Sequence, residues 1–247
     1  MNKKIRIAIV MIIAMSMQVI SVSAMVSGSD TEYSVVDVKN GGTISGAITF
    51  DGQMSEAKKI SVSKDTKVCG KHKMDESLLV DATTKGIQNA VVYLKKIGAG
   101  KKWRASENSF AMDQKGCQFT PRVLVVPAGE KFLMLNNDGI LHNIHTRSEL
   151  NKEINKAQPR FLKKMKLTFE KPEFVKVACD VHNWMQGWVV VASNPYYTVT
   201  GKSGKFEITN VPAGTYELQV WHEKLAPQTA QVQVKAGETT SVDISLK

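Results

Sequence analysis

Apolar and polar residues alternate along much of this chain, which is the pattern of strands that bury one face. Between residues 42 and 50, Ile44, Ile48 and Phe50 fall on one face, and threonine and serine fall on the other. The same alternation recurs throughout residues 197–247. Further strands are predicted at residues 90–94, 119–126, 131–135, 167–169, 174–178 and 187–192. The pattern therefore predicts an all-β protein.

Two stretches interrupt this series of strands. Residues 53–81 are rich in lysine and serine and are predicted to be mostly loop. Residues 148–157 are the stretch predicted to be helical, with Ser148 as the N-cap and Pro159 ending the helix. The Gly- and Lys-rich residues 98–109 are a reasonable boundary between two parts of the chain.

The N-terminal segment has the composition of a secretory signal peptide. Basic residues precede an apolar run over residues 7–20, and small residues follow up to Ala24. The run is short for a membrane span. We therefore predict that residues 1–24 are a cleaved signal peptide and that the protein is periplasmic or secreted. An uncleaved N-terminal anchor is the alternative.

The chain is basic, with 33 Lys and Arg against 23 Asp and Glu and a formal net charge of +10. Loss of residues 1–24 would remove three basic residues and no acids, which lowers the charge to +7. Aromatic residues do not interleave with the lysine pairs as single-stranded nucleic-acid binders require. The predicted partner is therefore an acidic protein or an anionic membrane surface, and not a nucleic acid.

One loop in the second half of the chain concentrates metal-binding chemistry. Cys179, His182 and Met185 follow at spacings of three, just before a predicted strand. Taken singly, a Cys or a Met among apolar residues is more often part of the core. Taken together, a thiolate, an imidazole and a thioether suit copper, and a second His would complete the set. His142, which follows another predicted strand and its turn, is the candidate.

This order and spacing resemble the cupredoxins, and within them most closely amicyanin, pseudoazurin and plastocyanin. The resemblance implies a cupredoxin Greek-key β-sandwich that holds one type 1 copper ion. Carried over to this sequence, the copper ligands are His142, Cys179, His182 and Met185, and Asn143 braces the Cys loop.

Two residues near the motif need separate comment. Asn183 stands where amicyanin-like loops usually have proline, so the rigidity of the loop stays open. His145 lies three residues after His142 in an extended segment, which turns its side chain to the opposite face. We expect His145 behind the ligands or at the surface.

Three cysteines are an odd number for an exported protein. If Cys179 binds a metal, Cys69 and Cys117 remain as an even pair. We therefore predict a disulfide between Cys69 and Cys117.

The C-terminal part carries a second resemblance. Residues 204–216 resemble carboxypeptidase regulatory-like domains, which have a transthyretin-like β-sandwich. In that family the first two strands read much like residues 42–46 and 89–94, which lie far upstream here. The copper domain is then inserted into the smaller sandwich, and a tandem arrangement is equally compatible. The predicted domains are N-terminal strands at 37–96, the copper domain at 100–192 and the regulatory-like sandwich at 194–247.

Four protein ligands leave no open position for a substrate, which favours electron transfer over catalysis. We predict a protein that is not an enzyme and that exchanges electrons with a c-type cytochrome or a membrane redox complex. A copper-handling protein and a metal-free binding or adhesion module are the alternatives.

The cupredoxin resemblance also implies a docking surface. In those proteins the His of the Cys loop reaches the surface through an apolar patch, which here would expose His182 beside Trp184. Lys163 and Lys164 would steer an acidic partner towards it. The competing interpretation is that Trp184 is core and that the lysines are a solvated face.

Overall fold

The structure is a computed structural model that describes residues 33–54, 56–103 and 110–247. The predicted signal peptide lies outside these residues. Strands dominate the described part, and its one helix is four residues long, so the prediction of an all-β fold is confirmed. No helix among the described residues is long and apolar enough to span a membrane.

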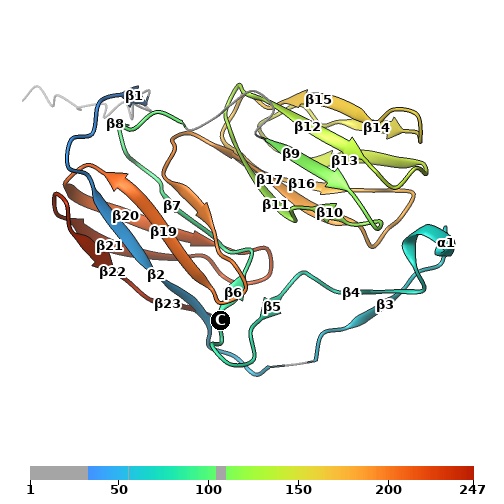
Figure 1. Cartoon of the computed structure of the whole chain (residues 1–247), viewed down its shortest axis with the longest axis horizontal. Helices are drawn as coiled ribbons and strands as arrows, with labels where there is room; N and C mark the ends of the chain where they lie inside the picture. Colours follow the sequence, from blue (N-terminus) through green and yellow to red (C-terminus); the bar gives the residue numbers. More distant parts are fainter. Residues whose placement is uncertain (1–32, 55, 104–109) are drawn as a thin grey trace, which may run out of the picture. The chain divides into compact units, whose positions relative to one another are not determined.

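Strands from the middle of the chain form two sheets, which we call the central sandwich (Figure 1). The first sheet has the order β10 (Phe119–Thr120), β9 (Ala111–Gln114), β12 (Lys131–Asn136) and β15 (Lys164–Thr168). The second has the order β11 (Val123–Pro127), β17 (Gln186–Ala192), β16 (Glu173–Ala178), β13 (His142–Arg147) and β14 (Asn155–Gln158). The strands predicted in this region are present, except that the single strand predicted at residues 119–126 is divided into β10 and β11, which lie in different sheets.

Strands that precede and follow this region form a second pair of sheets, the flanking sandwich. One sheet has the order β18 (Tyr197–Val199), β7 (Val91–Leu94), β20 (Gly214–Trp221) and β21 (Gln228–Val234). The other has the order β19 (Lys205–Val211), β2 (Gly42–Phe50) and β22 (Thr239–Ser241), with β23 (Ile244–Leu246) also paired to β2.

The pairing of β2 and β7 decides between insertion and tandem arrangement. β2 pairs antiparallel with β19 and parallel with β22 and β23, and β7 lies between β18 and β20. The prediction that β2 pairs with the C-terminal strands is confirmed, so the central sandwich interrupts the flanking one in sequence. The residue boundaries predicted for the domains stay predictions.

Strand β17 buries both of its faces. Val189 and Val191 belong to the core of the central sandwich, whereas Val190 packs in a separate cluster with Val91 of β7. The Arg122 guanidinium, which also faces the flanking sandwich, pairs with the Glu223 carboxylate at 2.6 Å. A strand that is covered on both sides needs apolar residues without alternation, which explains the apolar run in β17.

Residues 58–74 leave the flanking sandwich as an excursion that we call the strap. It contains β3 (Lys59–Ser61), helix α1 (Thr66–Cys69) and β4 (His72–Met74). Cys69 forms a disulfide with Cys117, and Val62 is buried in the core of the central sandwich. The predicted loop thus has defined structure because it is fastened to the central sandwich. The remaining short strands are β1 (Ser34–Val35), β5 (Leu79–Val80), β6 (Ile87–Gln88) and β8 (Ala99–Gly100).

The prediction of a helix at residues 148–157 is wrong. The Glu173 carboxylate accepts hydrogen bonds from the side chains of Ser148 and Asn151, at 2.6 and 2.9 Å, and from the amide of Leu150. These contacts fix a turn, and residues 155–158 then pair with β13 as strand β14. Side-chain hydrogen bonds to a distant carboxylate override the local preference for helix.

The interrupted flanking sandwich predicts that residues 195–247 do not fold alone. This fragment lacks β2 and β7, which are inner strands of the two sheets, and it lacks the fully buried Ile44 and Ile48. Unpaired strands and an open core should leave it poorly dispersed in NMR spectra and without cooperative unfolding. A control that joins residues 33–96 to 194–247 by a short linker should fold better. A fragment that unfolds cooperatively without β2 would contradict the pairing.

Candidate metal centre

Three metal-binding atoms converge at one end of the central sandwich. The Nδ1 atoms of His142 and His182 lie 2.9 Å apart, and the Cys179 Sγ lies 3.8 Å from each. The two imidazoles are 0% exposed and Cys179 is 2% exposed. His142 begins β13, and Cys179 and His182 lie in the loop from β16 to β17. The three residues that sequence analysis singled out thus form one buried cluster.

The Cys loop is closed by its own main chain. The Cys179 amide donates to the Met185 carbonyl at 3.3 Å, and the Met185 amide donates to the His182 carbonyl at 2.9 Å. Ala178 and Gln186, at the two ends of the loop, are paired across β16 and β17. Met185, the fourth predicted ligand, is 1% exposed at the end of this loop. The antiparallel strand pair therefore brings Cys179, His182 and Met185 to one place.

A carboxylate binds the far nitrogen of each imidazole. Nε2 of His142 lies 2.9 Å from Asp138 Oδ2, and Nε2 of His182 lies 2.9 Å from Asp65 Oδ2. Because an ionised carboxylate only accepts hydrogen bonds, each Nε2 carries the proton. The lone pairs of both Nδ1 atoms then face each other and the Cys179 sulfur. Two lone pairs at 2.9 Å beside a thiolate repel each other unless a proton or a metal cation lies between them.

In the absence of a metal, the pKa values favour a proton at this point. Burial disfavours the His142 imidazolium, but the Asp138 carboxylate and Cys179 outweigh it and raise the pKa of His142 to about 9. Burial would raise the pKa of the Cys179 thiol, but hydrogen bonds from His142 and the Asn143 amide lower it. Burial is also the main cause that lowers the pKa of His182. A thiolate beside positive charge is the state that the surroundings favour.

The donor set fits a metal ion. A triangle with the three observed sides has its centre about 2.1 Å from each corner, close to the lengths of metal bonds to His nitrogen and Cys sulfur. Two imidazoles and one thiolate with a weakly held Met form the set that is typical of copper. The donor atoms of His142, Cys179 and His182 therefore lie at separations that fit a shared metal ion.

Asn143 connects β13 to the Cys loop. Its amide N–H donates to the Cys179 sulfur at 3.5 Å, and its side-chain oxygen accepts the Asp180 amide at 2.5 Å. Its side-chain nitrogen donates to Asp180 Oδ2 at 3.2 Å. Asn143 therefore holds the main chain beside Cys179, in the position where sequence analysis expected a bracing residue.

Other predicted residues lie outside the cluster. His145 is bound to Asp180 at 2.8 Å and takes no part in the group of donor atoms. Trp184 is half-buried, its ring centroid lies 5.1 Å from that of His182, and its indole N–H donates to the Cys117 carbonyl at 3.2 Å. Lys163 and Lys164 are exposed at the start of β15.

The prediction that the His182 ring reaches the surface is wrong. The ring is fully buried because Asp65, from the strap, lies against its outer nitrogen. Asp65 and Asp138 are the two residues that sequence analysis missed. Asp138 stands four residues before His142 in a turn and offered a signal. For Asp65, the sequence offered no signal except its place four residues before Cys69.

Comparisons with known protein families match both halves of this description. Residues 106–192 match the family model of copper binding proteins of the plastocyanin/azurin family, and residues 182–247 match that of the carboxypeptidase regulatory-like domain. The predicted resemblances are therefore confirmed, and the chain combines a cupredoxin-type region with a regulatory-like sandwich. The matches overlap at residues 182–192, which the structure places in the central sandwich.

No curated protein sequence matches the chain. Among solved structures, a methionine-to-alanine mutant of amicyanin in the Cu(I) state is 20% identical over 36% of this chain and 85% of its own, with a TM-score of 0.32. A novel purple cupredoxin from Nitrosopumilus maritimus is 23% identical over 33% of this chain and 98% of its own, with a TM-score of 0.28. A copper-containing nitrite reductase from Thermus scotoductus SA-01 is 19% identical over 40% and 25%, with a TM-score of 0.32. Scores this low support no statement about function.

The hydrogen bonds of Asn143 predict an effect on metal affinity. Asn143→Ala leaves the Asp180 amide without its side-chain acceptor and frees the main chain beside Cys179. We expect the dissociation constant for copper(II) to rise about 10- to 100-fold, measured by competition with a chelator of known affinity. The control is Asn151→Ala, which also removes amide hydrogen bonds but far from the loop. Equal affinities for the wild type and Asn143→Ala would contradict the role.

Proposed function

We propose that this chain is an exported type 1 copper protein that transfers electrons. One copper ion would be held by His142, Cys179, His182 and Met185. The observation that carries the proposal is the convergence of two imidazole lone pairs and a thiolate at a buried point. A bound copper ion would supply a site that gains and loses one electron.

The residues around the site favour electron transfer over catalysis. The donor residues are 0–2% exposed, so water and substrates are kept away from them. The hydrogen bonds from Asp65 and Asp138 hold both imidazoles, so the ligands stay in place when the charge of the site changes. A fixed and dry ligand set lowers the rearrangement that accompanies electron transfer, whereas a catalytic metal needs an open position.

The proposed partner is an acidic redox protein, such as a c-type cytochrome or a component of a membrane redox complex. The support is the basic charge of the chain, which stays at +7 without residues 1–24. Opposite charges speed the encounter, and salt screens them with a Debye length of about 8 Å at physiological ionic strength. Export by residues 1–24 would place both proteins outside the cytoplasm. An anionic membrane surface is attracted by the same charge.

Copper titration tests the proposal. The mature protein should take up one equivalent of copper(II) and develop an intense visible band from thiolate-to-copper charge transfer, which Cys179→Ser should abolish. His145→Ala should keep the band, because His145 is outside the donor cluster. Paramagnetic resonance would identify the type of site.

The other outcomes separate the alternatives. An unchanged band in Cys179→Ser would show that the ligand assignment is wrong. Slow and reversible loss of copper, without reduction by an acidic cytochrome, would favour copper handling. A protein that takes up no copper would favour a binding or adhesion module.

A further inference from the structure

One side chain of the strap lies directly against the buried His182 ring. The Asp65 carboxylate lies 2.9 Å from Nε2 of the fully buried ring, and the Asp65 side chain itself is 42% exposed. On the other side of the cluster, His142 is bound to Asp138, whose side chain is only 5% exposed. The shortest hydrogen-bonded connection from a metal-binding residue to the surface therefore runs from His182 through Asp65.

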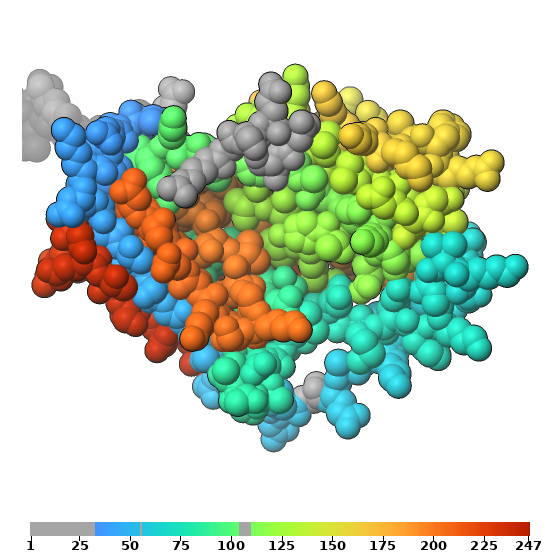
Figure 2. All heavy atoms as spheres, in the orientation of Figure 1, coloured from blue at the N-terminus to red at the C-terminus, as the bar shows by residue number. Residues whose placement is uncertain are grey.

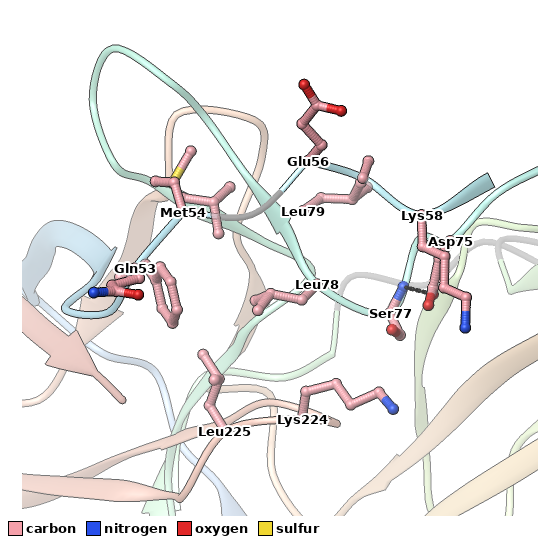
Figure 3. A pocket seen from close by; sticks show the side chains of 13 residues that line it. Gln53, Met54, Glu56, Lys58, Asp75, Ser77, Leu78, Leu79, Lys224 and Leu225 are labelled. Atoms are coloured by element: carbon pink, nitrogen blue, oxygen red, sulfur yellow. Dashed lines mark hydrogen bonds between the residues drawn. The ribbon is translucent and has the colours of Figure 1, made fainter.

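The strap is fastened close to this contact. The Cys69–Cys117 disulfide joins it to the central sandwich, and the Cys117 carbonyl accepts the indole N–H of Trp184 at 3.2 Å. The strap packs less tightly where it leaves the flanking sandwich, because a cavity of about 390 Å³ lies there (Figure 3). The side chains of Leu78 and Leu225 line this cavity. The contacts at the metal end therefore hold the strap in place.

The outer surface of the strap is strongly basic. Residues 58–74 contain six lysines and one acidic residue, Asp65. Lys64, Lys67 and Lys71 are exposed around Val68, which is 42% exposed, and the strap is visible in cyan and teal on the surface in Figure 2. The strap thus presents a basic surface next to the contact between Asp65 and His182.

We propose that the strap is the docking surface for the redox partner and the point where electrons enter the site. The partner it fits is a protein with an acidic surface, whose carboxylates face Lys64, Lys67 and Lys71. One electron passes from the reduced partner through Asp65 and His182, and the partner is oxidised by one electron. No covalent bond forms or breaks. This inference rests on the proposed function.

A rival surface surrounds the predicted docking residues Lys163 and Lys164. Phe161 beside them is 81% exposed and Leu162 is 36% exposed, so this surface combines apolar and basic residues. On this side, however, the described contacts from His142 to the exposed Lys163 pass through the almost buried Asp138 and then through Asn136. The strap has the shorter connection to a metal-binding residue.

Charge reversal in the copper-loaded full chain tests the docking surface. The probes are hexacyanoferrate(II), an anion, and tris(phenanthroline)cobalt(II), a cation, each reducing the copper(II) form. Lys64→Glu with Lys67→Glu should slow the reaction with hexacyanoferrate(II) about tenfold and speed the reaction with the cobalt complex. The matched control, Lys202→Glu with Lys205→Glu, makes the same charge change on exposed residues of the flanking sandwich and should change neither rate much.

Charge reversal at Lys163 and Lys164 tests where electrons enter the site. If Lys163→Glu with Lys164→Glu slows hexacyanoferrate(II) and the strap pair does not, electrons enter elsewhere and the inference is overturned. Equal effects from all three pairs would also overturn it, because only the net charge would then matter. The visible copper band of each variant shows whether the metal site is intact.

An experiment on the metal-free protein separates this inference from the proposed function. In the apo protein, Asp65→Ala should increase the rate at which Cys179 reacts with a neutral disulfide reagent at least tenfold, since the carboxylate that lies against His182 is then removed while the disulfide still holds the strap. Asp65→Asn keeps a hydrogen-bond acceptor and should react at the wild-type rate. Equal rates for all three proteins would show that the strap does not cover the site. A wild type that binds no copper would instead overturn the proposed function, and the docking role with it.

Discussion

Two hydrogen bonds from imidazole to carboxylate determine what the site can bind. A free imidazole carries its proton on either nitrogen, and only one of the two tautomers presents Nδ1 as a donor of electrons. Asp138 and Asp65 select that tautomer in His142 and His182 by accepting the proton of each Nε2. The lone pairs are thereby directed at each other and at Cys179. Partners of this kind commonly orient and tune metal ligands.

The two carboxylates come from different parts of the chain. Asp138 belongs to the turn that precedes β13, and the amides of Gly116 and Cys117 hold it at 2.5 and 2.8 Å. Asp65 belongs to the strap, which leaves the flanking sandwich and is fastened next to the same Cys117. The disulfide thus lies at the junction of both supports. The central sandwich carries the ligands, but it does not provide all the contacts that orient them.

Much of the fold and of the ligand set could be predicted because the signals are local. Strand alternation and the regular spacing from Cys179 to Met185 are visible within short stretches, and the odd number of cysteines needs only a count. The failures are long-range. The turn after Ser148 depends on Glu173, and the burial of His182 depends on Asp65, which is 117 residues away in sequence. No pattern near His182 indicates that another segment will cover it, and the family resemblance predicted the opposite.

The pairing of β2 has a consequence for the order in which the chain assembles. β2 is synthesised early, yet its neighbours β19, β22 and β23 are among the last five strands to be made. Contacts between residues so far apart in sequence form slowly, because a long loop must close before they are gained. The central sandwich, whose strands are contiguous in sequence, can complete its sheets first. Until the C-terminal strands arrive, β2 presents unpaired edges, so folding of this chain depends on protecting its earliest strand from other chains.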